Sequence, residues 1–150
     1  MSDSDPVRFA RNTADYVAVL DHFRRCAGRF VPPLQSRVDL LDYARRITDN
    51  SVTFEAWAGG SLCGLVAAYL NDVEGRCGFI TNVSVDASVA GKGLATALVR
   101  QCLSAAREQG FKCLSLEVCA ENEPAIAIYR KLGFTGSVIK EMLVMRLDLK

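Results

Sequence analysis

The sequence predicts an α/β protein formed by a single domain, with seven strands and four helices. Three observations support this fold class. Half of the 150 residues are hydrophobic and 23% are charged, a balance typical of an ordinary globular domain with one core. Segments with alternating apolar residues recur along the chain, as strands require, and other segments have apolar residues at helical spacing. One strand-like stretch runs through a glycine-rich loop into a helix, a connection typical of α/β folds.

The beginning of the chain predicts one strand and two helices. The first six residues are expected to form a frayed tail. Alternation of apolar and polar residues predicts a strand over residues 7–12. Thr13 is the expected N-cap of a first helix, and Gly28 is expected to end that helix. Apolar residues at helical spacing predict a second helix over residues 38–49.

A three-stranded meander is expected next. Gly59 and Gly60 predict a tight turn between its first two strands. The strands are expected over residues 52–58, 62–70 and 76–85. The third of these strands leads into the glycine-rich loop.

The rest of the chain predicts two helices and three strands. Gly110 and Gly133 are expected to end the two helices, and Pro124 suits the first turn of the second one. In order, the elements are a helix over residues 93–110, a strand over 114–118, a helix over 125–132, and a closing hairpin over 135–140 and 143–149.

Charge and hydropathy exclude several classes of protein. The formal net charge is +1, which argues against a nucleic-acid surface supported by bulk charge. No apolar run is long enough to span a bilayer. The first residues are acidic and polar, unlike a secretory signal peptide, so a cytoplasmic location is expected.

The cysteines predict no metal site and no disulfide framework. They are Cys26, Cys63, Cys77, Cys102, Cys113 and Cys119. None forms a C-x-x-C pair and most lie in apolar segments, which predicts reduced, buried thiols in a cytosolic protein. The only histidine, His22, lies in the first expected helix, where a structural or solvated role is expected. Without histidines and ligand spacing, no zinc site is expected.

The most informative stretch is residues 81–95, with the sequence TNVSVDASVAGKGLA. It begins as a strand, breaks at Asp86 and enters a helix near Gly93. The first N–H groups of a helix lack intrahelical partners and lie at the positive end of the macrodipole, so they attract anions. Gly91 and Gly93 have no side chain to keep a phosphate away, and Lys92 adds a positive charge. The stretch therefore predicts a pyrophosphate site.

Two well-known nucleotide loops do not fit this stretch. A P-loop needs Ser or Thr after the lysine and an earlier glycine that is missing here. The dinucleotide fingerprint needs a third glycine where Thr96 stands. A tight turn that only opens a long helix remains the alternative to an anion site.

A second motif covers residues 116–134, with the sequence LEVCAENEPAIAIYRKLGF. Together with NVSVDxxxxGKGLA, it resembles the GNAT superfamily of acetyl-CoA-dependent N-acetyltransferases. The resemblance covers residues 76–134 well, and the expected order of elements extends it over nearly the whole chain. It implies a mixed, mostly antiparallel central sheet of about seven strands flanked by about four helices, with a cleft where the fourth and fifth strands splay apart.

The resemblance also implies how acetyl-CoA, the cosubstrate, would bind. Backbone groups of Val83 and Val85 would pair with pantetheine, and Asn122 would hydrogen-bond the cofactor arm. Tyr129 would stand near the sulfur. The residues implied around the pyrophosphate are Gly91, Lys92, Gly93, Leu94 and Ala95.

The implied reaction moves an acetyl group from a thioester to an amine. Free amines are mostly protonated at pH 7, so a group must accept a proton. Glu117 is the candidate base, because its position resembles the glutamate of the ribosomal-protein N-terminal acetyltransferases; a salt bridge to Lys112 or Arg130 is the alternative. Tyr129 is the candidate acid, with a packing role as the alternative. A backbone N–H near Val85 would stabilise the oxyanion.

Two departures from the family pattern concern binding. Ala90 stands where the family usually has Gln or Arg, so weaker cofactor binding is expected. The turn at residues 140–141 is short, which predicts an open acceptor side or one completed by another subunit. The expected acceptor is a primary amine of a small molecule, such as an amino sugar or its nucleotide conjugate. Protein N-terminal acetylation and non-catalytic acyl-CoA binding are the alternatives, and a homodimer is expected only from the family.

Overall fold

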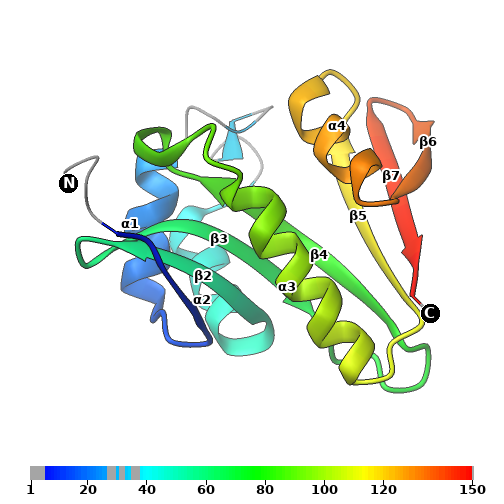
Figure 1. The fold of residues 1–150 in the computed structure, drawn as a ribbon, viewed down its shortest axis with the longest axis horizontal. Coiled ribbons are helices and arrows are strands. Elements are labelled where there is room, and N and C mark those ends of the chain that lie inside the picture. The colour runs from blue at the N-terminus through cyan, green and yellow to red at the C-terminus, as the bar shows by residue number, and fades with distance from the viewer. Residues whose placement is uncertain (1–5, 27–29, 31–32, 35–37, 150) are drawn as a thin grey trace.

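One mixed sheet of seven strands organises the described residues, with the strand order β1-β2-β3-β4-β5-β7-β6 (Figure 1). The computed structural model describes residues 6–26, 30, 33–34 and 38–149. The strands are β1 (Arg8–Arg11), β2 (Val52–Ala58), β3 (Ser61–Tyr69), β4 (Cys77–Val85), β5 (Cys113–Cys119), β6 (Thr135–Ile139) and β7 (Met142–Asp148). The helices are α1 (Tyr16–Cys26), α2 (Leu40–Asn50), α3 (Leu94–Glu108) and α4 (Glu123–Lys131), with a 3₁₀ turn, η3, at Ala87–Val89.

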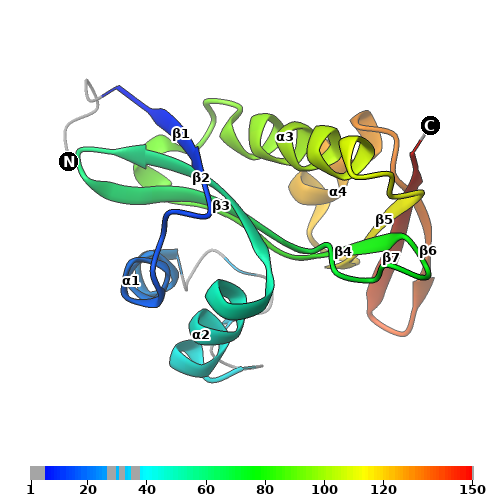
Figure 2. The same ribbon diagram turned by 90° about the horizontal axis from the view of Figure 1, so that it is seen from below.

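Helices cover both faces of the sheet. Figure 2 shows α1 and α2 on one face and α3 and α4 on the other. Each face has its own apolar cluster, because an amphipathic helix must bury its apolar stripe against a sheet. On the α1–α2 face, Phe23 stacks on Tyr43 at a ring-centroid distance of 5.5 Å. On the other face, Leu98 and Cys102 of α3 are fully buried in the larger cluster. The order of elements predicted from the sequence is confirmed.

The sheet is antiparallel except between β4 and β5. These two strands pair in parallel over only four residue pairs, from Cys77 opposite Cys113 to Ile80 opposite Leu116. Beyond that point β4 continues to Val85 without β5 as its neighbour. The predicted splay of the fourth and fifth strands is therefore confirmed.

A bulge in β4 lies just where the two strands part. In the pairing with β3, Ala67 faces Asn82 whereas Ala68 faces Ile80, so Thr81 is an extra residue. A bulge bends its strand and increases the local twist, which turns the end of β4 away from its neighbour. Tyr43 of α2 holds the bulge, because its hydroxyl donates to the Thr81 carbonyl oxygen at 2.8 Å.

The start of the first helix differs from the prediction. Asp15, and not Thr13, caps α1, because the Asp15 Oδ1 accepts from the backbone N–H of Ala18 at 2.9 Å. Thr13 instead donates to the buried carboxylate of Glu55 on β2. Gly28, which was expected to end this helix, and most of the expected terminal tail lie outside the described residues.

The expectation of six reduced cysteines is wrong for one pair. Cys77 on β4 and Cys113 on β5 are joined by a disulfide, whereas Cys63, Cys102 and Cys119 are free thiols. The two are partners in the parallel ladder but are 36 residues apart in sequence, so no local motif announces them. Disulfides are rare in the reducing cytosol, so this bond bears directly on the expected cytoplasmic location, which stays a prediction. Within the described residues, no helix is both long and apolar enough to cross a membrane.

Glu55 is a fully buried carboxylate that ties the chain before α1 to the sheet. It accepts from the backbone N–H groups of Thr13 at 3.0 Å and Ala14 at 3.1 Å, and from Trp57 Nε1 at 3.0 Å. The hydroxyls of Thr13 and Thr53 also donate to it. Burial alone would raise the pKa of this carboxyl, but these hydrogen bonds outweigh it and hold the pKa below its ordinary value.

We expect Glu55→Gln to lower the free energy of unfolding by about 2 kcal/mol at pH 7, because an amide group would turn an N–H towards donors that need an acceptor. A folded-state pKa below the unfolded one stabilises the protein above the unfolded pKa, and this contribution is lost as the pH falls through the folded pKa. The difference between the wild type and the variant should therefore shrink below about pH 4.

Urea unfolding between pH 3 and pH 7 measures this effect. Glu74→Gln, at an exposed turn residue, is the matched control and should leave stability unchanged. A difference between wild type and Glu55→Gln that does not depend on pH would contradict the carboxylate argument.

Candidate active site

The glycine-rich loop presents an open helix N-terminus. Gly93 occupies the N-cap of α3 with φ of 75°, and Gly91 has φ of 80°, both in the left-handed region that favours glycine. A Cβ added at either position would meet no atom within 4 Å, so the glycines serve backbone conformation and access rather than tight packing. No side chain caps α3 at Gly93, so the first N–H groups of the helix have no side-chain acceptor, as an anion site needs.

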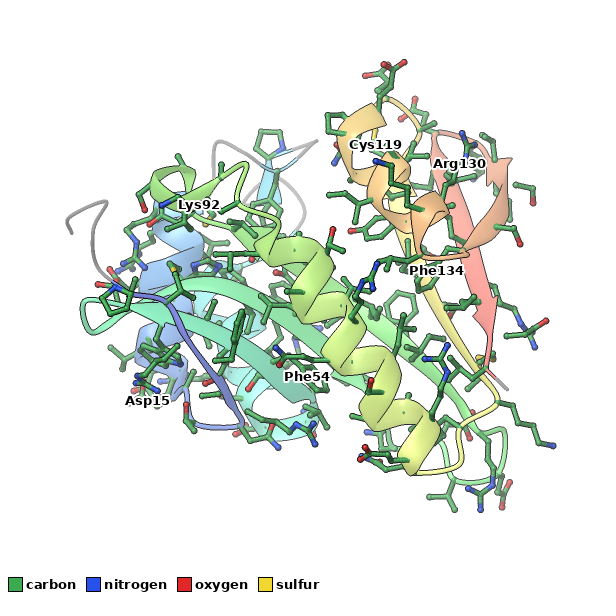
Figure 3. The ribbon with its side chains drawn as sticks, viewed as in Figure 1. Asp15, Phe54, Lys92, Cys119, Arg130 and Phe134 are labelled. Carbon is green, nitrogen blue, oxygen red and sulfur yellow. A yellow bond between two sulfur atoms is a disulfide. The ribbon has the colours of Figure 1, made fainter. Side chains whose placement is uncertain are left out.

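The loop is anchored by Asp86 at the end of β4. Its N–H donates to the Cys63 carbonyl oxygen at 2.8 Å, and its carboxylate accepts from the Ser88 N–H at 3.4 Å. Arg25 of α1 lies 3.4 Å from the same carboxylate. The start of α3 therefore has a fixed position relative to β3 and α1. Figure 3 shows Lys92 on this loop, with Cys119 and Arg130 across from it on the β5–α4 side.

A cleft of about 180 Å³ lies where β4 and β5 part. Residues from α1, β4, α3 and α4 contribute to it, as does Phe30. Its lining residues are Cys26, Phe30, Val83, Ser84, Val85, Ala95, Asn122, Pro124, Ala125, Ile128 and Tyr129. The cleft thus joins five of the residues named from the sequence, since Val83, Val85, Ala95, Asn122 and Tyr129 all belong to it.

Tyr129 places a protonated phenol in an apolar setting. The residue is 7% exposed, and its ring lies edge-on to Phe134 with 6.0 Å between centroids. Burial raises the pKa of Tyr129 to about 12, so the phenol keeps its proton at pH 7. A neutral phenol at the wall of a cleft can donate a hydrogen bond or a proton to a developing anion.

Asn122 is the N-cap of α4 and also lines the cleft. Its Oδ1 caps α4 by accepting from the Ala125 N–H at 3.4 Å, and Pro124 occupies the first turn of the helix. Because Oδ1 serves the cap, the amide Nδ2 is the group that can donate to a ligand. Leu94 points its side chain into the core, so only its backbone faces the loop.

Glu117 does not lie in the cleft wall. It stands on β5 opposite Val144 of β7, with an exposed side chain between the buried Leu116 and Val118. In the described part of the chain, no ion pair joins it to Lys112 or Arg130. The structure does not bring Glu117 together with Tyr129 in one cleft lining.

Two polar residues at the cleft were not predicted as site residues. Ser84 lines it, and His22 of α1 lies behind Ser84 with its Nε2 2.9 Å from the Ser84 Oγ. The alternation of β4 carries the signal that could have found Ser84. With Val83 and Val85 on the α3 face, Ser84 between them must face α1. No local pattern connects it to His22, which is 62 residues away.

Comparisons with known proteins agree with this geometry. The profile described as "Acetyltransferase (GNAT) family" matches residues 16–134. The chain is 35% identical over 125 residues to spermidine N(1)-acetyltransferase of Escherichia coli K12, a match covering 77% of this chain and 64% of that protein. It is also 35% identical over 111 residues to mycothiol acetyltransferase of Catenulispora acidiphila, covering 69% of this chain and 35% of that protein. The matched segments thus span about a third to two thirds of these relatives.

Solved structures share the fold at low sequence identity. The ribosomal-protein-S18-alanine N-acetyltransferase of Escherichia coli superposes with a TM-score of 0.78 at 20% identity, covering 97% of this chain and 95% of that one. The PaiA N-acetyltransferase of Thermoplasma acidophilum, solved in complex with coenzyme A, gives a TM-score of 0.75 at 11% identity over 95% of this chain and 99% of that one. These likenesses concern the fold.

We expect Gly93→Ala to cost about 1 kcal/mol of stability, because a side chain in the left-handed region is strained even where space is free. Gly93→Asn should cost less, since Asn tolerates this region. Chemical unfolding of the three proteins gives the comparison. Equal losses for Ala and Asn would point to packing rather than backbone strain.

Proposed function

This chain belongs to the GNAT acetyltransferase family, and from that premise we propose that it transfers an acetyl group from acetyl-CoA to the primary amine of a small molecule. The observation that carries the proposal is one cleft in which the protonated Tyr129 faces the free end of β4, close to the uncapped start of α3. An anion site and a proton donor in one cleft are what acyl transfer from a phosphate-bearing thioester requires.

The chain offers groups for each part of acetyl-CoA. Gly91, Lys92 and Gly93, with the backbone N–H groups of Leu94 and Ala95, would hold the pyrophosphate. In the described part of the chain, residues 82–85 of β4 pair with β3 alone, so backbone groups on their other edge are available to an extended pantetheine arm. These are the groups that Val83 and Val85 would use. Asn122 would donate from Nδ2 to the same arm.

The proposed chemistry is direct attack of a neutral amine on the thioester. Glu117, exposed on β5, would accept a proton from the incoming ammonium group. A backbone N–H near Val85 would stabilise the oxyanion, and Tyr129 would protonate the leaving thiolate. Relatives named for spermidine support a small-molecule amine as the acceptor. The cytoplasmic location and the homodimer stay predictions.

Binding is tested by thermal unfolding with acetyl-CoA. A ligand that binds only the native state increases the free energy of unfolding, by about 2.7 kcal/mol at a ligand concentration of one hundred times the dissociation constant. The melting temperature rises as a result. We expect acetyl-CoA and CoA to raise it, and adenosine to have a smaller effect because it lacks the pyrophosphate. Lys92→Gln should weaken the shift. An unchanged melting temperature at saturating acetyl-CoA would overturn the assignment of the cleft.

Catalysis is tested by thiol release with spermidine, glucosamine and a peptide beginning with Ala as acceptors. We expect Tyr129→Phe and Glu117→Gln to lower kcat by about 100-fold or more, the scale of general acid–base catalysis. The KM for acetyl-CoA should change little, because neither substitution removes a phosphate contact.

Tyr16→Phe and Glu108→Gln, both at exposed positions, are the matched controls and should keep wild-type rates. Preference for the peptide over both small amines would favour protein N-terminal acetylation. Full activity of Glu117→Gln would remove this residue from the mechanism.

A further inference from the structure

A chain of buried polar groups runs behind the cleft. His22, the single histidine of the sequence, is fully buried on α1. Its Nδ1 lies 3.0 Å from the Leu62 carbonyl oxygen and its Nε2 lies 2.9 Å from the Ser84 Oγ. Ser84 in turn donates to the Asn82 Oδ1 at 2.8 Å. Ser84 and Asn82 are 7% and 6% exposed, and Ser84 lines the cleft with Tyr129.

The three contacts among Leu62, His22, Ser84 and Asn82 need three protons, and the neutral groups supply two; the Cys26 Sγ, 3.7 Å from both ring nitrogens, is a weaker partner of the ring. The Leu62 carbonyl can only accept, so the proton of a neutral ring sits on Nδ1 and leaves Nε2 as an acceptor. The single hydroxyl proton of Ser84 then has two acceptors, Nε2 and the Asn82 Oδ1. A further proton on Nε2 would satisfy all three contacts at once. Ser84 is the member of this hydrogen-bonded chain that lines the cleft, as does Cys26 beside the ring.

We propose that Ser84 and His22 form a relay that takes up one proton from the acceptor amine during acetyl transfer and returns it within the same turnover. This inference rests on the proposed function. Ser84 would contact the reacting nitrogen, whereas His22 acts through Ser84 and is a positioning residue. The arrangement has the features of an activated hydroxyl: a base within hydrogen-bond reach, itself oriented by a third group.

The proton balance of the reaction needs two acceptors. An amine that arrives as an ammonium ion loses one proton before attack, and Glu117 passes this one to water. Once the nitrogen has bonded to the thioester carbon it is positively charged and loses a second proton. Ser84 accepts this proton at Oγ while its own hydroxyl proton moves to the Nε2 of His22.

The second half of the turnover restores the relay. The C–S bond breaks, and Tyr129 gives its proton to the leaving thiolate. The resulting phenolate takes the proton that the His22 imidazolium returns through Ser84. The net products are the amide, free CoA and one proton in solution, and each side chain ends as it began.

The surroundings of His22 fit a short-lived imidazolium. Burial, together with the charge of Arg25, lowers the pKa of His22 to about 4, so the ring is neutral and able to accept at pH 7. The Leu62 carbonyl and two carboxylates act in the opposite direction. The titratable groups around the ring are Asp21, Arg25 and Cys26 of α1 and Asp86 after β4. A fully buried ring in this setting does not exchange its proton with water directly, so the proton returns through Ser84.

The resting state is tested by ¹⁵N NMR of the histidine ring, which gives one set of signals because the chain has one histidine. At pH 7 we expect a neutral ring with its proton on Nδ1 and Nε2 shifted as a hydrogen-bond acceptor. In Ser84→Ala the Nε2 signal should move towards that of an unbonded nitrogen. A charged ring, or a proton on Nε2 in the wild type, would overturn the relay whatever the activity.

The relay itself is tested by kinetics with acetyl-CoA and spermidine. His22→Gln keeps a polar group near Ser84 but cannot take a proton, and Ser84→Ala removes the entry point. Each should lower kcat about 100-fold, with the KM for acetyl-CoA within twofold of wild type. The double variant should be no slower than either single one, since both act in one path. Ser84→Thr, which keeps the hydroxyl, should recover much of the rate.

Controls separate this inference from folding and from the proposed function. Thr53→Val removes another buried hydroxyl, outside the cleft wall, and should keep wild-type kcat. A wild type that binds no acetyl-CoA and acetylates none of the three amines overturns the proposed function. A wild type that is active while His22→Gln and Ser84→Ala keep kcat within threefold of it overturns the relay alone.

Discussion

The parting of β4 and β5 after four residue pairs is the constraint on which the rest of the structure depends. Because the two strands are parallel, their carboxyl ends lie at the same edge of the sheet, and ligands of α/β sheets bind at such edges. α3 begins at Leu94 and α4 at Glu123, after the ends of these strands, and residues at the start of both helices line the cleft. Asn122 caps α4 with its side chain, whereas Gly93 leaves α3 open. Under the proposed function, this difference makes the start of α3, and not that of α4, the end that would receive the pyrophosphate.

The strands are held together at one end and kept apart at the other. Next to the Cys77–Cys113 disulfide, the Lys112 N–H donates to the Arg76 carbonyl oxygen at 2.6 Å, which fixes the base of the pair. Further along, the bulge at Thr81 twists β4 away, and the hydroxyl of Tyr43 anchors it. The cleft is therefore formed by the backbones of β4 and β5, which the disulfide and the Tyr43 hydroxyl hold in place.

Features that reside in one continuous stretch of sequence could be predicted. The glycine loop and the strand before it are local patterns, and so is the run from Leu116 to Phe134 that contains Tyr129. Local patterns fix which face of a strand a residue occupies, and Glu117 is exposed between two buried neighbours. Local patterns do not fix how far a residue lies from a cleft that other elements form. The separation of Glu117 from the cleft that contains Tyr129 could therefore not be predicted.

Features that join distant elements escaped the sequence for one physical reason. The hydrogen bond of Thr13 to Glu55 spans 42 residues, the disulfide 36, and the contact of His22 with Ser84 62. Each depends on the register between strands or on the docking of a helix, and neither is encoded by local periodicity. In the sequence, a polar residue that becomes buried looks like any other polar residue. What allows its burial is the set of hydrogen-bond partners, and these come from distant parts of the chain.

The buried polar groups His22, Ser84 and Asn82 lose contact with water on folding, and this desolvation has a free-energy cost. His22 sits beside an apolar cluster that contains Phe23 and Leu62, where an apolar side chain would need no hydrogen bonds at all. Replacing a polar group and its partners with apolar ones is often neutral or stabilising, so packing alone does not explain a buried imidazole at this position. The mostly apolar cleft gives the polar groups a reason to be there, because a low dielectric strengthens every hydrogen bond and charge that faces a reacting atom. Ser84 and Tyr129 reach that space from opposite sides of it, one on the strand that ends early and one on the helix that starts beyond it.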